Sequence, residues 1–370
     1  MTMKHRLQCD TSGLRIRVEQ SLTPKAKRQL LEFLATCPPA NWMQCPEFPR
    51  RCPPPARHRY VMLSAKERHG QLAGFGLARL SRLMPGRYLA SFRRGPVTSS
   101  PENLARILPG FAARLRQMGC CSMQLNPRWS GAEDVAEVTR ILQQAGARQL
   151  PAEEQSLHAA TALVDLSGQP EDLMGRLKQR CRRQIRKAAK AGLEVRPAET
   201  EAQAQAFGAL MRTFFQARGL GMESVPPVER QWAMTRERGA FLLAWQQDHL
   251  MGGHVMIGDG DRAFWLVLAR AEGQRAAAPA GYPLIWEALK LAQAQGFAFY
   301  DMAGAPPGGG SGAAAADAGA RNRDQFKSAF NPDVTPLVPA HVLPLRQPDH
   351  AVLFGLRQKA RSLRAAWRQR

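Results

Sequence analysis

Long apolar runs are absent from this sequence. No stretch of about 18 apolar residues, the length that crosses a bilayer as a helix, occurs in the 370 residues. Residues 1–10 carry positive charge but no apolar segment of the kind found in secretory signals. We therefore expect a chain that is neither exported nor membrane-spanning, and a cytoplasmic location.

Cysteine is sparse and shows neither a disulfide pattern nor a metal-binding pattern. The seven cysteines are odd in number and scattered, without CxxC or Cys/His ligand spacing. The adjacent Cys120 and Cys121 lie in an apolar segment, where cysteine usually packs as a small core residue. These features indicate reduced thiols in a reducing compartment.

Common catalytic and cofactor motifs are also missing. The sequence contains no GxSxG, HExxH, Walker or GxGxxG pattern, and its eight histidines show no ligand spacing. Hydrolytic, zinc-dependent and dinucleotide chemistries are therefore disfavoured. We expect no metal site and no bound cofactor.

Acidic residues are few, so the chain is strongly basic. Lys and Arg number 52 against 30 Asp and Glu, which gives a net charge of +22. This charge predicts an anionic partner: a phosphodiester backbone, a nucleotide-linked substrate or an acidic membrane face. A solvated basic surface without a partner is the alternative.

The chain is long enough for two hydrophobic cores, and its first half contains a recognisable order of elements. Strand-like runs at 72–77 and 88–92 precede a helical stripe over 104–115 and a third apolar run at 120–125. Pro109 is expected to kink this helix or split it in two.

The second half repeats that order. Strand-like runs at 250–257 and 263–268 precede a helical stripe over 284–292 and the strand 297–300. The repeat predicts an α+β (α/β) fold of two tandem domains, each with a mixed, twisted sheet flanked by helices. We place the domains at 1–155 and 156–345.

Three further segments have unusual composition. A helix is expected over 170–191, and its stretch from Arg176 to Lys190 carries eight basic residues in fifteen. Residues 303–320 are almost entirely Gly, Ala and Pro and are expected to form a mobile loop. A basic amphipathic helix is expected over 346–370; we favour its docking on the protein over binding of tRNA or peripheral contact with an anionic membrane.

Three motifs, in this order along the chain, resemble the FemABX family of tRNA-dependent aminoacyltransferases. The first is Arg94-Gly95-Pro96-Val97, the second is the basic helix from Cys181 to Ala188 with the Gly192–Val195 segment that follows it, and the third is the pair 300–304 and 326–330.

The resemblance implies two GNAT-like domains and transfer of an amino acid from aminoacyl-tRNA to an amine. The coiled-coil arm of some family members has no room here, because only about 25 residues separate Gln216 from Phe241. The armless FemX-like form is therefore the better comparison, and we expect a monomer. The family often carries an acidic residue after the Arg-Gly-Pro motif, whereas this chain has Thr98-Ser99-Ser100. The acceptor is therefore left open between a peptidoglycan precursor and a small-molecule or secondary-metabolite amine.

The resemblance also assigns roles to residues. Lys327 and Asp301 are expected to be catalytic, Lys327 near the reacting carbonyl. The alternative for Lys327 is a solvated lysine on the surface. The alternative for Asp301 is a cap on the loop that follows its strand. Substrate-binding residues are expected to be Arg94, Gly95, Tyr300, Phe326 and Trp265. Binding of tRNA phosphates is expected from Arg176, Arg180, Arg183, Arg186, Lys187 and Lys190.

Two other functions stay open. One is a GNAT-type N-acyltransferase that uses acyl-CoA or an acyl carrier, although the first half lacks a clear Gln/Arg-x-x-Gly-x-Gly/Ala pyrophosphate loop. The other is a non-catalytic basic protein that binds RNA or associates with the envelope, which surface positions for Lys327 and Asp301 would favour.

Overall fold

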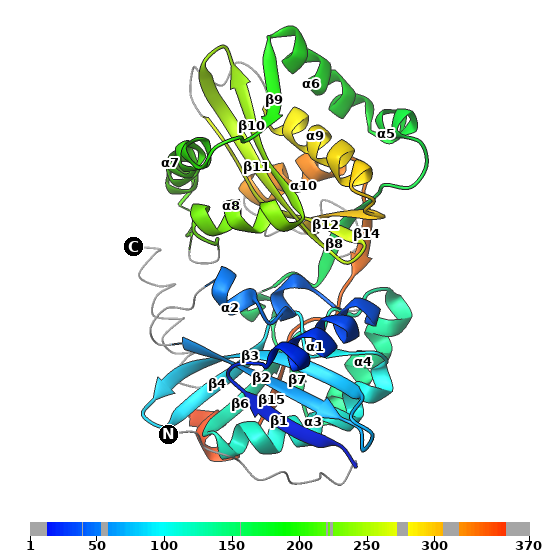
Figure 1. Cartoon of the computed structure of the whole chain (residues 1–370), viewed down its shortest axis with the longest axis vertical. Coiled ribbons are helices and arrows are strands. Elements are labelled where there is room, and N and C mark those ends of the chain that lie inside the picture. Colours follow the sequence, from blue (N-terminus) through cyan, green and yellow to red (C-terminus); the bar gives the residue numbers. More distant parts are fainter. Residues whose placement is uncertain are drawn as a thin grey trace. The chain divides into compact units, whose positions relative to one another are not determined.

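The computed structural model describes residues 13–38, 40–52, 58–155, 157–219, 221–222, 225–271, 280–305 and 318–352 (Figure 1). The chain divides into two compact units. Unit 1 comprises Met1–Ala159 and Pro336–Arg370, and unit 2 comprises Ala160–Thr335. No helix within the described ranges is long and apolar enough to cross a bilayer.

Unit 1 contains a mixed sheet with the strand order β1-β2-β3-β4-β6-β15-β7, and β5 pairs with β3. Strands β1 to β4 are antiparallel, and β4 pairs with β6 in parallel. The strands are β1 (Arg15–Glu19), β2 (His58–Lys66), β3 (Leu72–Met84), β4 (Arg87–Phe92), β5 (Val97–Thr98), β6 (Cys120–Leu125), β7 (Arg148–Gln149) and β15 (His341–Pro344). The helices are α1 (Pro24–Thr36), η1 (Trp42–Gln44), α2 (Phe48–Arg51), α3 (Pro101–Gln117), α4 (Ala132–Gln144) and η2 (Ala152–Glu154).

The helix α3 packs directly on the sheet of unit 1. Its N-cap Ser100 accepts a hydrogen bond from the backbone of Asn103 at 3.4 Å. Gly74 of β3 makes room for α3, because a Cβ atom there would lie 2.8 Å from Ile107 Cδ1. The expected split at Pro109 does not occur: α3 is one helix, and the buried stripe on either side of this proline holds it to the sheet.

Unit 2 contains the second mixed sheet, with the strand order β14-β8-β13-β12-β11-β10-β9. Its strands are β8 (Ala160–Asp165), β9 (Leu193–Pro197), β10 (Gly239–Gln246), β11 (His249–Asp259), β12 (Arg262–Arg270), β13 (Phe299–Gly304) and β14 (Asp333–Pro336). The helices are α5 (Pro170–Arg176), α6 (Gln179–Lys190), α7 (Glu201–Ala217), α8 (Val228–Glu237), α9 (Gly281–Ala294) and α10 (Ala318–Ser328). Helices α6 and α9 lie on one face of this sheet, and α7 and α8 lie on the other (Figure 1).

The two sheets have the same plan, as the sequence repeat predicted. In each, an antiparallel strand pair leads through a helix to a strand that pairs in parallel: β3, β4, α3 and β6 in unit 1, and β11, β12, α9 and β13 in unit 2. The sheet of unit 1 also takes a strand from the second half of the chain, because β15 pairs with β6. In unit 2, β8 pairs with β13.

The structure differs from three expected boundaries. Residues 336–345, expected in the second domain, lie in unit 1 because β15 pairs with β6 and β7 there. The expected helix 170–191 is two helices, α5 and α6. In the expected loop 303–320, Ala303 and Gly304 end β13 and 318–320 begin α10, while 306–317 lie outside the described residues. Most of the expected C-terminal helix, 353–370, lies outside them too.

Candidate active site

The strands β12 and β13 pair only briefly in unit 2. Their parallel register runs from Arg262↔Phe299 to Phe264↔Asp301, and among the described residues no further pair of β12 with β13 follows. The strand β13 also bulges between Asp301 and Gly304, where Ala303 adopts a φ of 61°. Such a conformation is strained for a residue with a side chain, so the surrounding contacts must hold it in place.

Asp301 holds this bulge. Its side chain is 4% exposed, and its Oδ1 accepts hydrogen bonds from the Thr161 hydroxyl at 2.5 Å and from the backbone N–H of Ala303 at 2.8 Å. The carboxylate thus ties β8 to the strained turn at the end of β13. This arrangement supports the loop-capping role of Asp301, which was the alternative to a catalytic one.

Lys327 lies in the last turn of α10 and reaches the same bulge. Its Nζ donates a hydrogen bond to the carbonyl oxygen of Gly304 at 2.6 Å and lies 5.6 Å from the centre of the Trp265 ring. Burial lowers the pKa of Lys327 to about 8, and the nearby Asp301 and Asp324 carboxylates oppose that change. A solvated surface lysine does not fit these contacts.

Aromatic side chains surround Lys327. The ring of Phe326 lies 6.0 Å from Trp265, 4.8 Å from Tyr282 and 5.4 Å from Phe330, measured between ring centres. Trp265 and Phe326 are partly exposed, whereas Phe330 is fully buried. Two of the predicted substrate-binding residues, Trp265 and Phe326, are therefore brought together with Lys327.

Tyr300 lies in the core of unit 2. It is fully buried, and its hydroxyl donates to His254 Nε2 at 2.5 Å, while His254 Nδ1 donates to the carbonyl of Val267 at 2.9 Å. Burial lowers the pKa of His254 to about 3, which keeps the ring neutral, and burial raises the pKa of Tyr300. The burial contradicts direct substrate contact by Tyr300. This pair links β11 to β13 beside the site. The signal for His254 in the sequence is its position between Gly253 and Val255 in an apolar run, which did not suffice to predict it as part of the site.

Arg94 and Gly95 lie in unit 1 and serve its internal packing. Arg94 is 8% exposed, and its guanidinium donates to Asn126 Oδ1 at 3.3 Å and to the carbonyl of His158 at 3.0 Å. A Cβ atom at Gly95 would lie 2.3 Å from the buried side chain of Gln44. The motif therefore has a structural explanation, and its substrate-binding role stays a prediction.

The basic residues expected to bind tRNA belong to two helices. Arg176 ends α5 and is engaged within unit 2, with the ion pair to Asp165 at 3.5 Å and a hydrogen bond to the carbonyl of Ser167 at 2.7 Å. The helix α6 buries Cys181, Ile185 and Ala188 and contains no acidic residue. Its exposed basic residues are Arg180, Arg183, Arg186, Lys187 and Lys190.

The start of α6 is joined to the segment that carries Lys327. Lys178, the N-cap residue of α6, donates its backbone N–H to the carbonyl of Ala329 at 3.1 Å, two residues beyond Lys327. Positive charge at a helix N-terminus opposes the helix dipole, so this end of α6 favours a bound anion. Across the described ranges, no three His, Cys, Asp or Glu side chains come together as a metal site.

The parallel strand pair that separates beyond a short register, flanked by helices on both faces, agrees with the sequence comparison. Residues 175–316 match the family described as the acetyltransferase (GNAT) domain. Unit 2 therefore carries a GNAT-type acyltransferase domain. No curated protein matches the sequence.

Solved structures extend the likeness to both units. The structure of FemX is similar with a TM-score of 0.74 at 13% identity, covering 91% of this chain and 99% of that chain. A conserved protein of unknown function from Bacteroides thetaiotaomicron has a TM-score of 0.59 at 10% identity, over 88% and 98% of the two chains. A tandem GNAT protein from the clavulanic acid biosynthesis pathway has a TM-score of 0.52 at 13% identity, over 90% and 98%. The chain has the tandem GNAT-like fold of FemX, as the resemblance predicted.

Proposed function

We propose that this protein moves an amino acid from aminoacyl-tRNA to the amine of an acceptor and forms an amide bond there. The observation that carries the proposal is the hydrogen bond from Lys178 to Ala329, which joins the basic helix α6 to the Lys327 segment. An RNA strand bound along α6 would therefore run toward the segment that carries Lys327.

The chemistry requires little of the protein beyond positioning and charge. The amine nitrogen bonds to the ester carbonyl carbon, the carbonyl electron pair moves to oxygen, and the bond to the tRNA ribose oxygen then breaks. The ribose oxygen takes up the proton that the amine loses. The Lys327 ammonium stabilises the developing oxyanion, a contribution of about 3 kcal/mol for a single donor.

The surroundings of Lys327 support this role. The partly exposed rings of Trp265 and Phe326 exclude water beside the ammonium, and a charge acts more strongly where water is excluded. Asp301 raises the pKa of Lys327 against the effect of burial and so keeps more of it charged. We therefore assign Asp301 a positioning role and Trp265 and Phe326 contact with the aminoacyl group.

The helix α6 would hold the tRNA. Five exposed basic side chains on a helix without acidic residues repel one another unless an anion is near. The acceptor is a peptidoglycan precursor or a small-molecule amine. The half-buried position of Lys327 counts against a non-catalytic binding protein, for which a solvated surface lysine was expected.

Transfer from acyl-CoA is the second candidate, because the family that residues 175–316 match is described as an acetyltransferase domain. Two parallel incubations distinguish the donors. In one, the protein and a set of amines are incubated with a pool of tRNAs charged with labelled amino acids, with and without RNase. In the other, labelled acetyl-CoA replaces the charged tRNAs. RNase-sensitive transfer of label from tRNA to an amine supports the proposal. Transfer from acetyl-CoA alone would replace it with the second candidate.

A further inference from the structure

Two arginines of unit 1 lie together on the sheet face that α1 and α2 cover. The antiparallel register places Tyr60 of β2 and Ser91 of β4 on either side of Arg79 of β3, so these three side chains form one row. Arg93 follows Ser91 by two residues, just beyond the end of β4, and its carbonyl accepts a hydrogen bond from Gln44 Nε2 at 2.7 Å. Burial lowers the pKa of Arg93, and the nearby Arg79 guanidinium lowers it further, so two like charges lie close together.

Neither arginine has a negative partner within the described ranges. Both side chains are partly exposed, and neither forms an ion pair or a side-chain hydrogen bond with a described residue. The Nε atom of Arg79 is buried without a partner there. The strands β2, β3, β4 and β6 contain no Asp or Glu, and the sequence of residues 53–57, between α2 and β2, contains none either. Glu47, the acidic residue at the start of α2, is paired with Lys27 and Arg50.

The polar neighbours of the two arginines are neutral. Burial raises the pKa of the Tyr60 hydroxyl, and burial raises the pKa of the Cys52 thiol to about 11. The Ser91 hydroxyl donates to Gln124 Oε1 at 3.2 Å. The two guanidinium groups are therefore surrounded by uncharged side chains, and withdrawal of a charge from water is costly unless an opposite charge is near.

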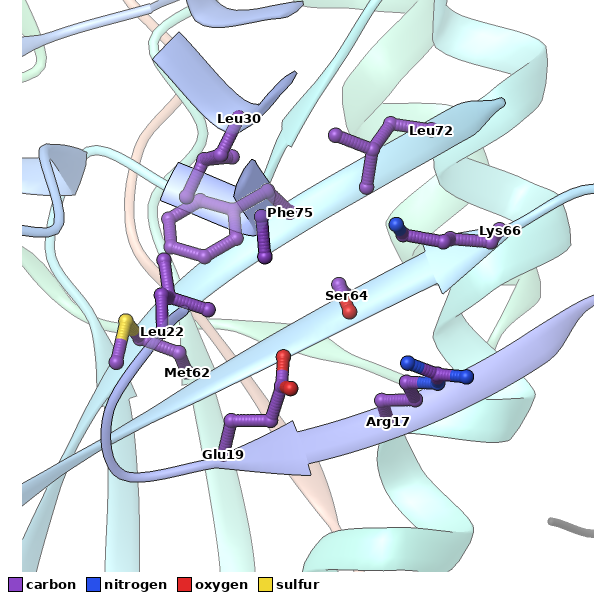
Figure 2. A pocket seen from close by; sticks show the side chains of 10 residues that line it. Arg17, Glu19, Leu22, Leu30, Met62, Ser64, Lys66, Leu72 and Phe75 are labelled. Atoms are coloured by element: carbon purple, nitrogen blue, oxygen red, sulfur yellow. The ribbon is translucent and has the colours of Figure 1, made fainter. Parts of the chain in front are cut away.

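The charges further along the same sheet face are balanced. Arg17, Lys66 and the Glu19 carboxylate line one hollow beneath α1, where Figure 2 shows Glu19 on the same strand as Arg17 and Lys66 on the next strand. The Nζ atom of Lys66 also donates to Gln29 Oε1 at 3.5 Å. The pair of Arg79 and Arg93 has no such carboxylate beside it.

From this arrangement we infer that Arg79 and Arg93 bind a phosphate-type dianion in unit 1. A phosphoryl group carries about two negative charges, and its oxygens match the paired N–H donors of two guanidinium groups. The Tyr60 hydroxyl adds a further donor. A single carboxylate would neutralise one guanidinium and leave the other without a counter-charge. Free orthophosphate, a phosphate ester and a diphosphate share this chemistry.

Calorimetric titration at constant ionic strength tests the inference with three probes: orthophosphate, methyl phosphate and diphosphate. Acetate, a carboxylate with one charge, is the matched control. We expect saturable binding of at least one phosphate probe, at least tenfold tighter than that of acetate, and the probe that binds most tightly identifies the source of the phosphoryl group. The titration requires no turnover, so its outcome is independent of the proposed aminoacyl transfer.

Variants locate the binding. Arg79→Gln and Arg93→Gln should each weaken binding of the best probe by about tenfold or more, the scale of one charge-assisted hydrogen bond. Arg93→Lys keeps the charge and should weaken binding less than Arg93→Gln does. Arg82→Gln, at an exposed arginine of β3, should leave binding unchanged. Because each glutamine variant removes repulsion between two like charges, its melting temperature in phosphate-free buffer should equal or exceed that of the wild type.

Three results would overturn the inference. The first is that none of the phosphate probes binds more tightly than acetate. The second is that binding is unchanged in both glutamine variants, or is lost in the α6 double variant Arg183→Glu, Lys187→Glu, which would place the anion on α6 instead. The third is a lower melting temperature of both glutamine variants in phosphate-free buffer, because other protein groups would then already balance the two charges.

Discussion

Lys327 combines a fixed position with a pKa near neutrality. Its hydrogen bond to Gly304 sets the place of the ammonium, and burial lowers its pKa to about 8. Since the charged form is the one that stabilises an oxyanion, the residue serves the reaction below about pH 8 and loses its charge as the pH rises through that value.

The pH dependence of transfer follows from this. The single-turnover rate of the wild type should fall as the pH rises above about 8. Lys327→Arg should be slower, because a planar guanidinium cannot replace a compact ammonium, but it should lack this fall because Arg stays charged. Rates measured between pH 6 and 9.5 check the prediction. A fall of equal size in Lys327→Arg would assign the titration to another group.

The buried pair of Tyr300 and His254 is expected to act on stability. Tyr300→Phe removes the donor to His254 Nε2 and leaves that nitrogen unpaired in the core, so the free energy of unfolding should fall by about 1–3 kcal/mol. Since Tyr300 is fully buried, kcat should stay within about twofold of the wild type. This is well below the tenfold change in rate that about 1.4 kcal/mol of activation free energy produces. Denaturant unfolding and steady-state rates measure the two effects. Unchanged stability with a large loss of kcat would return Tyr300 to the catalytic site.

The break between α5 and α6 is a tertiary effect. Leu173, Leu177 and Cys181 repeat at helical spacing, which predicts one helix over 170–191. In the structure Leu177 and Lys178 have extended backbones with ψ near 150°, and the Lys178 N–H bonds to Ala329 instead of continuing a helix. No proline or glycine stands at 177–178 to announce this, because the partner lies about 150 residues further along the chain.

The exposed face of α6 is expected to determine how tRNA binding depends on salt. Replacing Arg183 and Lys187 by Glu should weaken binding and flatten the slope of log affinity against log salt, because fewer counterions are released. The matched control replaces Arg28 and Arg140, exposed residues of unit 1, by Glu, which changes the net charge equally. Fluorescence anisotropy at several salt concentrations gives the slopes. If the slope of log affinity against log salt is the same for the two double variants, the exposed face of α6 is solvated and does not bind tRNA.

At the scale of the whole molecule, the repeated order of elements was predictable because each element follows from local periodicity. The helical stripe over 284–292 became α9, and the apolar runs at 72–77 and 263–268 became parts of β3 and β12. The place of β15 in the sheet of unit 1 was not predictable, since nothing in the four residues His341–Pro344 says which sheet they join. The separate roles expected of Lys327 and Trp265 followed from the family resemblance, whereas the contact between the two side chains could be seen only in the structure.

The position of β15 in the sheet of unit 1 gives a prediction about local stability. Deleting residues 336–370 removes β15, the partner of both β6 and β7. The amides of β6 should lose hydrogen-exchange protection, while β11 and β12 in unit 2 keep theirs. Exchange followed by mass spectrometry compares the two sheets. Loss of protection confined to unit 2 would contradict the assignment of β15.

The central claim is that the Lys327 site transfers an aminoacyl group from tRNA. Its most direct test is the single-turnover transfer of labelled amino acid from charged tRNA to an amine by wild type, Lys327→Ala and the control Lys290→Ala, an exposed lysine of α9. We predict that Lys327→Ala slows transfer by about a hundredfold, the scale of one oxyanion donor, with little change in tRNA affinity, while Lys290→Ala matches the wild type. A change of about 1.4 kcal/mol in the activation free energy alters a rate tenfold. A Lys327→Ala rate within about twofold of the wild type would therefore remove Lys327 from the mechanism.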